Sequence, residues 1–525
     1  MVAAVMAGIS AMAAVGALGQ AHPRDGQIHD ADTRSWWHMT EALSGDDMEG
    51  RDTGTAAYQR AAEVVAGRFK AAGLEPAGEA GSYFQSVPMH AIDTLPEGTS
   101  FVVTRDGGAE ASGEVKLEFL QEITATWTPE SLREGAGALT FRGYCGKDAM
   151  KDVEGKIVVC FGTQRQGLPT GAERVANARN AGARGIVNVD DPYFTIEPPR
   201  WPYAYARSVT LKETGTARAP RESQMLPPMR LSAAAFAKLL AGSGHDAAAV
   251  LKAGGAKEPL ESFSIPGTMR VKLAAAEKEI ASPNVLGMLP GTDPALKEQV
   301  VVIAAHLDGY GYGTPVAGDG LYNGALDDAA YVALLIQFAE DLQHEHKALK
   351  RSVLFCAFTG EEKGLLGSSW FVEHPTVPVA RMAADINLDQ LRPLFPLKIL
   401  TAEAVDDTTL GTTARSVGAA MGVEIREDHE PERGLLRRAD QYPFLRIHVP
   451  AISFIFGYDA GTDAERRYRE WYQVRYHRPQ DDLTQPMDFA AAAKFDRFFY
   501  TLTETVANAA ERPSFVAGSP LAAKP

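Results

Sequence analysis

Four short apolar segments in the second half of the chain constrain the fold more than any other feature of the sequence. They lie at 299–305, 353–358, 383–388 and 449–456, and a helix with one apolar side is expected between the first two, over 329–342. Apolar strands that alternate with helices are typical of a largely parallel sheet covered on both faces. We therefore predict an α/β fold with a central, mostly parallel mixed sheet. In such folds the functional site lies beyond the carboxyl ends of the strands.

Acidic residues and histidines follow these segments. Considered alone, each has an ordinary explanation as an exposed hydrogen-bonded pair, a helix cap or a solvated loop residue. Together they form a set of nitrogen and oxygen ligands at one sheet edge, which suits two divalent cations that share a bridging carboxylate, with zinc preferred. The candidate residues are His306, Asp308, Asp327, Asp389, His477 and the adjacent pair Glu361 and Glu362, of which one glutamate would bind metal and the other would handle protons.

The order of these motifs resembles the zinc exopeptidase family of bacterial leucyl aminopeptidases, aminopeptidase Y and glutamate carboxypeptidase. The matching motifs are His306-Leu307-Asp308, Gly324-Ala325-Leu326-Asp327-Asp328, Glu361-Glu362-Lys363-Gly364, Asn387-Leu388-Asp389 and Tyr476-His477-Arg478-Pro479, with Met48-Glu49-Gly50-Arg51 near the start. The resemblance covers most of the chain and implies a zinc exopeptidase fold.

The resemblance also implies a role for each residue. His306 and Asp389 would bind one zinc, Glu362 and His477 would bind the other, and Asp327 would bridge the two. Glu361 would be the catalytic base, and Asp308 would orient His306. Leu326, Gln390, Arg478 and the stretch Ala439-Asp440-Gln441 depart from the family pattern without removing a proposed ligand.

An insert of different character interrupts the predicted peptidase domain. It holds short β-rich runs, a helical run over 172–181 and a loop rich in proline and arginine over 198–230. The stretches 155–159 and 178–186 resemble a protease-associated (PA) domain, which is non-catalytic in related exopeptidases. The expected domains are a leader over 1–21, the peptidase domain over 22–114 and 275–512, a PA-like insert over 115–274 and a tail over 513–525.

The first residues resemble a secretory signal peptide. Residues 2–19 are uncharged and rich in small apolar side chains, and Gly19-Gln20-Ala21 resembles a cleavage site. We therefore expect a secreted or periplasmic protein with no stable membrane association once the leader is removed. Cys160 and Cys356 lie in apolar runs, which favours buried thiols, although a bridge between Cys145 and Cys160 stays open.

The predicted function is hydrolysis of peptide bonds by a dinuclear zinc exopeptidase, with an aminopeptidase as the first choice. A glutamate carboxypeptidase-like enzyme is the alternative, for which Arg392, Arg437 and Arg438 would hold a substrate carboxylate, although surface charge is their simpler explanation. A receptor-like protein without activity and a glutaminyl cyclase-like acyl transferase are further alternatives. The net charge of −15 over 525 residues disfavours nucleic acid as a partner. The sequence does not indicate the oligomeric state.

Overall fold

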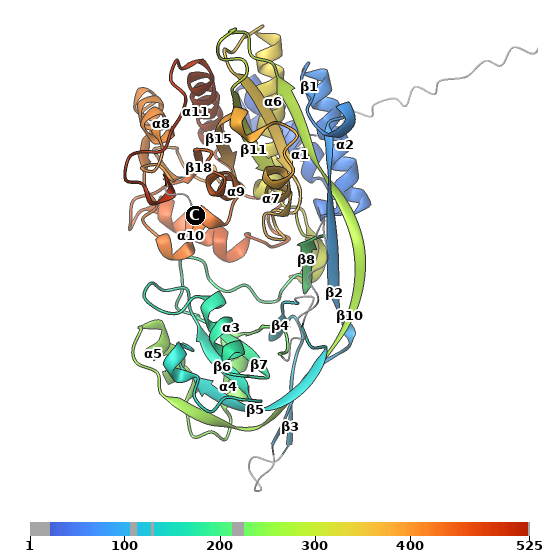
Figure 1. Cartoon of the computed structure of the whole chain (residues 1–525), viewed down its shortest axis with the longest axis vertical. Coiled ribbons are helices and arrows are strands. Elements are labelled where there is room, and N and C mark those ends of the chain that lie inside the picture. Colours follow the sequence, from blue (N-terminus) through green and yellow to red (C-terminus); the bar gives the residue numbers. More distant parts are fainter. Residues whose placement is uncertain (1–21, 106–112, 128–130, 213–224, 523–525) are drawn as a thin grey trace, which may run out of the picture.

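Two long antiparallel strands join two parts of the molecule (Figure 1). The computed structural model describes residues 22–105, 113–127, 131–212 and 225–522. Strands β2 (Phe84–Arg105) and β10 (Ser262–Leu289) form what we call the ribbon. The ribbon connects the main domain (residues 22–83 and 290–522) to the insert (residues 113–261). The predicted boundary between residues 274 and 275 therefore falls inside one continuous strand.

The main domain is built on a mixed sheet in the order β17-β16-β18-β15-β11-β14-β10. Strand β11 runs parallel to both of its neighbours, β14 and β15, and β15 runs parallel to β18. The ribbon strand β10 pairs antiparallel with β14. The strands are β1 (Glu75–Pro76), β11 (Val300–His306), β14 (Ser352–Phe358), β15 (Met382–Leu388), β16 (Ile399–Glu403), β17 (Glu424–Arg426) and β18 (Ala451–Phe456), and a separate hairpin joins β12 (Gly311–Val316) and β13 (Asp319–Tyr322).

Alternate residues of the central strands enter two hydrophobic cores, one on each face of the sheet. Val301 and Ile303 of β11 pack in the larger core with α6, whereas Val300 and Val302 pack in the smaller core with α7 and α9. This two-residue period explains why the strands read as uninterrupted apolar runs, because both faces are covered. The main-domain helices are α1 (Ala31–Ser44), α2 (Ala56–Ala71), α6 (Ala330–His344), α7 (Leu366–Glu373), α8 (Thr409–Ala420), α9 (Gln441–Arg446), α10 (Asp463–Val474) and α11 (Phe489–Asn508). The predicted α/β fold class is thus confirmed.

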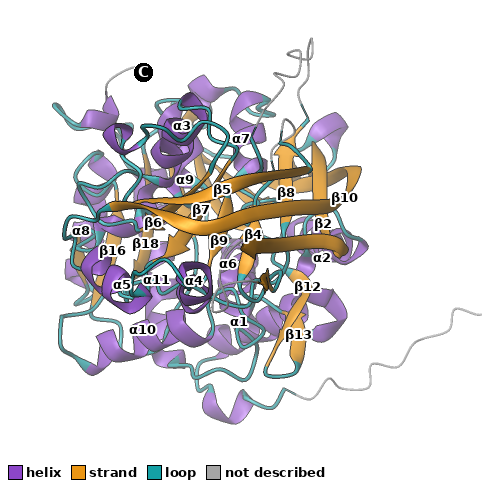
Figure 2. Ribbon diagram, turned by 90° about the horizontal axis from the view of Figure 1, so that it is seen from below, coloured by secondary structure: helices purple, strands orange, loops and turns teal. Residues whose placement is uncertain are grey.

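The strands of the insert extend the sheet from the Ser262–Lys272 part of β10, in the order β5-β6-β7-β9-β4. Helix α3 of the insert lies on one face of this part of the sheet, and α4 and α5 lie on the other (Figure 2). The insert elements are β3 (Gly113–Leu117), β4 (Ile123–Ala125), β5 (Glu134–Arg142), β6 (Ile157–Gly162), β7 (Gly185–Asp190), β8 (Arg207–Leu211), β9 (Met229–Leu231), α3 (Gly171–Asn180), α4 (Ala233–Leu240) and α5 (Ala247–Gly255). The segment predicted as a loop over 198–230 therefore contains two short strands, which its prolines and arginines concealed.

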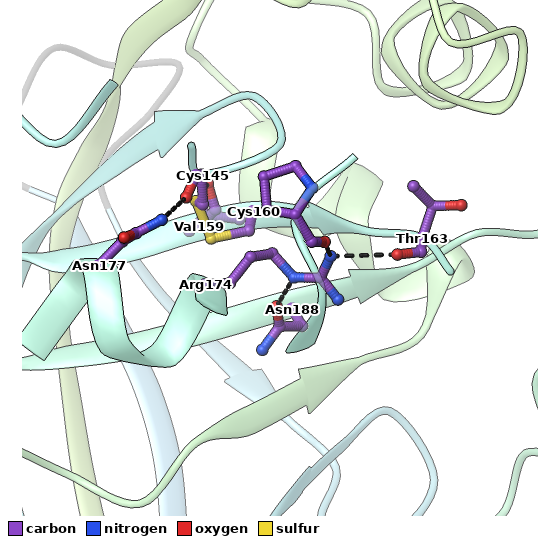
Figure 3. Close-up of a disulfide and its surroundings, with 8 residues drawn as sticks. Cys145, Val159, Cys160, Thr163, Arg174, Asn177 and Asn188 are labelled. Atoms are coloured by element: carbon purple, nitrogen blue, oxygen red, sulfur yellow. Dashed lines mark hydrogen bonds between the residues drawn. A yellow bond between two sulfur atoms is a disulfide. The ribbon is translucent and has the colours of Figure 1, made fainter. Parts of the chain in front are cut away.

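A disulfide between Cys145 and Cys160 lies beneath helix α3 (Figure 3). The Asn177 side chain of α3 donates a hydrogen bond to the Cys145 carbonyl, 3.1 Å away, and Arg174 of the same helix donates to Asn188. Cys356 is a buried free thiol, as its apolar surroundings predicted. The expectation of a free thiol at Cys160 was wrong, because β6 brings it beside the turn that carries Cys145.

The predicted leader over 1–21 lies outside the described residues. Within the part of the chain that the structure describes, no helix has the length and apolar character needed to cross a bilayer.

Candidate metal centre

The strand order places the site at the carboxyl end of β11, between β14 and β15. The chain leaves β11 toward β14 on one side and later reaches β15 on the other, which is the kind of reversal where open α/β sheets bind ligands. His306 ends β11, Glu361 and Glu362 follow β14, and Asp389 follows β15. Asp327 lies in the turn before α6. His477 lies in the turn that follows α10.

Asp327 lies between the two histidines, with one carboxylate oxygen toward each. Its Oδ1 is 3.2 Å from His306 Nε2, and its Oδ2 is 3.3 Å from His477 Nε2. Glu362 Oε2 is 3.2 Å from the same His477 nitrogen, and Asp389 Oδ1 is 3.7 Å from His306 Nε2. The five predicted ligands thus converge as two half-sites that share one carboxylate. We call them the His306 half-site (His306, Asp389) and the His477 half-site (His477, Glu362).

Asp328 also lies near the His306 half-site, close enough to form a cation-binding group with His306 and Asp389. Both of its oxygens already accept backbone N–H groups, from His306 at 3.2 Å and from Gln390 at 3.1 Å. By contrast, Asp327 Oδ2, His306 Nε2 and Asp389 Oδ1 are buried and accept or donate no hydrogen bond among the described residues. We therefore assign Asp328 to holding the backbone of both ligand-bearing strands, and Asp327 to the cations.

Glu361 points into the same space from the end of β14. Its Oε2 is 3.9 Å from His306 Nε2, and its backbone N–H donates to Asp308 Oδ1 at 3.0 Å. Burial, together with the nearby carboxylates of Asp389 and Glu362, raises the pKa of Glu361 well above its ordinary value. A carboxyl group with a raised pKa beside the ligands is suited to exchanging protons.

Asp308 acts differently from the expectation. Its backbone carbonyl lies 3.1 Å from His306 Nδ1 and orients the ring, whereas its carboxylate Oδ1 is 3.9 Å from that nitrogen. The carboxylate instead accepts from the Glu361 N–H and from the Thr53 hydroxyl, 2.9 Å away. Asp308 therefore positions both the His306 ring, a proposed ligand, and the backbone of Glu361, the candidate base.

His477 is held by a tyrosine. Tyr310 Oη lies 3.0 Å from His477 Nδ1, so Nε2 is left to face Asp327 and Glu362. Burial lowers the pKa of His477 to about 4. The ring is therefore neutral at physiological pH, which is the form that binds a metal ion.

Buried polar groups fix the turn that carries Asp327. Asp481 accepts the backbone N–H groups of Leu326 and Asp327 at 3.1 and 3.0 Å, so this acid, four residues after His477, has a structural role. Arg51 donates to the carbonyls of Leu307, Asn323 and Gly324 at 2.8 to 2.9 Å. The N-terminal motif thus reaches both the strand end at His306 and the Asp327 turn.

The unusual Gln390 and the nearby Arg392 form a buried pair. Arg392 is fully buried, lies 4.7 Å over the Tyr472 ring and donates to the Gln390 carbonyl at 2.9 Å. Arg392 is therefore neither surface charge nor part of the cavity described below. Asp440 accepts a hydrogen bond from the Ser368 hydroxyl, and Gln441 accepts from the Asn387 amide.

A cavity of about 450 Å³ opens from the two half-sites. Its inner wall contains Glu361, Asp389 and His477, and its outer wall contains Glu403, Arg437 and Arg446. Burial raises the pKa of Glu403 to about 7, with Asp428 adding to the shift. Of the predicted carboxylate-binding arginines, Arg437 and Arg438 line this cavity.

Sequence reasoning missed the residues that the insert contributes around the site. Tyr205 accepts a hydrogen bond from Lys363, the residue after Glu362, at 2.7 Å. Lys363 also lies 3.2 Å from Asp52, which pairs with Arg207. The concentration of arginine and aromatic residues near position 200 was the available signal, but it does not identify contacts made so far away along the chain.

Comparisons with known proteins agree with the geometry. Residues 284–502 match peptidase family M28, and residues 123–225 match the PA domain. A probable zinc metalloprotease of Pyrenophora tritici-repentis is 26% identical, and the match covers 38% of this chain and 52% of that protein. The chain thus spans about half the length of this curated relative.

Solved structures share the fold over nearly the whole chain. An aminopeptidase from Aneurinibacillus sp. strain AM-1 has a TM-score of 0.60 at 18% identity, covering 91% of this chain and 95% of that one. BSAP, a zinc aminopeptidase from Bacillus subtilis, has a TM-score of 0.53 at 17% identity, covering 91% and 95%. A peptidase M28 precursor from Shewanella amazonensis has a TM-score of 0.52 at 14% identity, covering 92% and 98%. These structures share the fold with this chain. The match of residues 284–502 to peptidase family M28 and of residues 123–225 to the PA domain confirms the predicted resemblance to this exopeptidase family with an inserted PA domain.

Proposed function

We propose that this protein is a zinc exopeptidase whose centre takes two cations, and that it releases N-terminal amino acids from peptides. The observation that carries the proposal is the position of Asp327, which directs one oxygen toward each half-site. A carboxylate in that position bridges two metal ions in two-metal hydrolytic sites.

The donor set fits zinc. Histidine nitrogen and carboxylate oxygen are ligands that zinc accepts, and three of these buried atoms have no other partner among the described residues. His306 and Asp389 would hold one ion, His477 and Glu362 the other, and Asp327 both. Bound zinc lowers the pKa of a water molecule and polarises a carbonyl group.

The protein's own groups move the proton. Glu361 lies beside both half-sites with a raised pKa and a backbone fixed by Asp308. It would take a proton from the attacking water and deliver it to the leaving nitrogen. Because the ligands and the base come from rigid strand ends, the site needs little rearrangement during the reaction.

Two features of the cavity bear on which peptide end is recognised. Carboxylates on its inner wall, Glu361 and Asp389, suit a free α-amine, and the names of the zinc aminopeptidases with this fold favour the same assignment. A carboxypeptidase-like activity is the second candidate. Its support is the pair Arg437 and Arg446, which are exposed on the cavity wall and form no ion pair with a described carboxylate.

We also propose a leader, a discontinuous peptidase domain with a PA-like insert that ends within β10, and export to the periplasm or exterior. The leader-like residues 2–19 motivate the proposal of export, and the Cys145–Cys160 disulfide agrees with an oxidising compartment. A receptor-like protein without activity is disfavoured, because the complete ligand set and the base lie together.

The test is Glu361→Gln, which removes the proton acceptor and leaves the ligands. We expect kcat to fall about 10²–10⁴-fold while zinc content stays at two per chain. Glu373→Gln, an exposed change at the end of α7, is the control and should leave both unchanged. Retained turnover in Glu361→Gln would show that Glu361 is not the catalytic base. If only amino-blocked substrates were cleaved, the aminopeptidase assignment would be wrong and the carboxypeptidase-like activity would take its place.

A further inference from the structure

One segment of the insert, residues 197–207, lies against the turn that carries His477. Arg478 donates to the carbonyls of Trp201 and Pro202 at 2.9 and 2.6 Å. On the other side of His477, the Arg200 guanidinium lies 4.4 Å over the Tyr476 ring. Both neighbours of this proposed ligand in the chain therefore contact the insert.

Glu197 is the charged centre of these contacts. Its buried carboxylate, 7% exposed, faces three guanidinium groups. Arg438 makes two bonds to it, at 2.6 and 3.0 Å, Arg200 lies at 3.3 Å, and Arg433 lies at 3.8 Å. Burial opposes ionisation, but the arginines hold the pKa of Glu197 well below its ordinary value. Removing this charge would leave two main-domain arginines without their shared carboxylate.

A short chain of contacts leads from Glu197 to the site. Arg438, held in place by Glu197, donates to Tyr476 Oη at 3.2 Å, and it also lines the cavity. Tyr476 precedes His477 directly. His477 itself has a φ of +53°, which a side chain of this size adopts only when its surroundings hold it there. The insert supplies part of that constraint through Arg200 and through the two carbonyls that Arg478 contacts.

Among the described residues, no hydrogen bond or ion pair joins the insert to His306 or Asp389. His306 and Asp389 are positioned by the strand ends and by Asp328, Asp308 and Arg51, all within the main domain. The two half-sites share Asp327 but differ in what orients their histidine. A disturbance of the insert segment should therefore reach one half-site and spare the other.

We propose that Glu197 of the PA insert is a positioning residue for the His477 half-site, acting through Arg438 and Tyr476, so that the insert is part of the metal centre. The inference rests on the proposed function, because it needs two cation sites. It predicts that Glu197 sets the metal affinity of one half-site only.

The experiment measures each half-site alone. Full-length Asp389→Ala retains only the His477 half-site, and Glu362→Gln retains only the His306 half-site. Zinc affinity is measured by competition with a chelator, first in these two proteins and then with Glu197→Gln added. We expect a loss of about tenfold or more in the Asp389→Ala background, the size usual for groups that orient ligands. In the Glu362→Gln background we expect less than a twofold change.

Asp191→Asn is the matched control. Asp191 is also a buried insert carboxylate, but its partners Thr163, Arg165 and Tyr193 all lie within the insert. It should change neither affinity. A second variant, Arg200→Gln, removes the ring contact to Tyr476 and one of the three guanidinium partners of Glu197, but it keeps the Glu197–Arg438 pair. It should weaken the same half-site. This second variant serves as the test if Glu197→Gln yields no folded protein.

The outcomes separate the inference from the function on which it rests. If the wild-type protein binds two zinc ions and neither Glu197→Gln nor Arg200→Gln weakens the His477 half-site, the inference is wrong and the proposed function stands. An equal loss at both half-sites would also overturn it, because that is the effect of general destabilisation. If the wild-type protein binds fewer than two zinc ions, the two-metal function itself fails.

Discussion

Replacing Arg51 by methionine should destabilise the main domain and weaken its hold on metal ions. The Arg51 side chain is fully buried and donates four hydrogen bonds, all to backbone carbonyls. Three of these carbonyls belong to the segments next to His306 and Asp327, and the fourth, that of Leu43, lies in the last turn of helix α1. Burial lowers the pKa of Arg51 to about 10, so the group stays charged at physiological pH. Methionine fills most of the same volume but donates nothing.

The size of the effect follows from those four bonds. Each buried carbonyl that loses its donor costs about 1–3 kcal/mol unless water replaces it, so the four carbonyls together cost at least about 4 kcal/mol. We therefore expect Arg51→Met to lower the free energy of unfolding by about 4 kcal/mol. For a domain of about 300 residues, with an unfolding entropy of about 2.1 cal/mol/K per residue, that corresponds to a fall in Tm of roughly 6 °C. Arg51→Lys keeps the charge but has a single donor nitrogen, so its loss should be smaller.

The assay combines thermal unfolding with chelator competition for zinc. Arg51→Met should show both the lower Tm and weaker zinc binding, because its carbonyl partners lie beside ligands of both half-sites. Arg60→Met is the control, since Arg60 is 46% exposed and bonds only Asp47 and Glu49 on the surface. Its expected change is within about 0.5 kcal/mol. A Tm for Arg51→Met within 2 °C of the wild-type value would refute the reasoning that these four hydrogen bonds stabilise the main domain.

Two further predictions concern parts of the molecule distant from the site. Reducing the Cys145–Cys160 disulfide, which closes a loop of 15 residues, should destabilise the insert by about 3 kcal/mol. Dithiothreitol should lower the Tm of the wild-type protein and leave that of a Cys145→Ser/Cys160→Ser variant unchanged. An unchanged wild-type Tm would contradict the prediction. Burial raises the pKa of Asp341 to about 6, so the folded state holds this proton between pH 4 and pH 6 while the unfolded state has lost it, and stability falls as the pH rises through that window. Asp341→Asn should remove the slope and gain about 1 kcal/mol at pH 8, after allowance for partial exposure, and equal urea midpoints for the two proteins at pH 8 would count against it.

The candidate ligands could be predicted because each follows a strong local signal. His306, Glu362 and Asp389 come directly after apolar strands, and parallel strands bring their carboxyl ends to one edge whatever loops connect them. Acids at a helix start are commonly caps, so the sequence favoured a capping role for Asp328 and a bridging role for Asp327, as the resemblance also did. The structure supplies the physical difference, because backbone N–H groups occupy both oxygens of Asp328 and leave Asp327 Oδ2 free of hydrogen bonds among the described residues.

Contacts between distant segments could not be predicted in this way. The role of Asp308 depends on which of its acceptors lies nearer the His306 ring, the backbone carbonyl at 3.1 Å or the carboxylate at 3.9 Å. The contact of Glu197 with Arg438 joins residues 241 positions apart. Neither periodicity nor spacing carries information about such a pair, because both residues lie in loops whose course depends on the packing of two separate cores.

The ribbon explains how an insert so far from the site in sequence can hold a ligand in place. Strands β2 and β10 pair residue by residue from Thr104–Thr268 near the insert to Phe84–Val285 in the main domain, with one irregularity near Lys272. Bending this ribbon sharply would break backbone hydrogen bonds, so the ribbon fixes the direction in which the insert lies better than a flexible linker would. The segment around Glu197 then forms a second attachment, remote from the ribbon along the chain. A body held at two separate places cannot turn freely about either one. Loss of Glu197 should therefore leave the insert attached through the ribbon and remove only the contact of Glu197 with Arg438 and, through Arg438, with Tyr476. The effect should be confined to the His477 half-site.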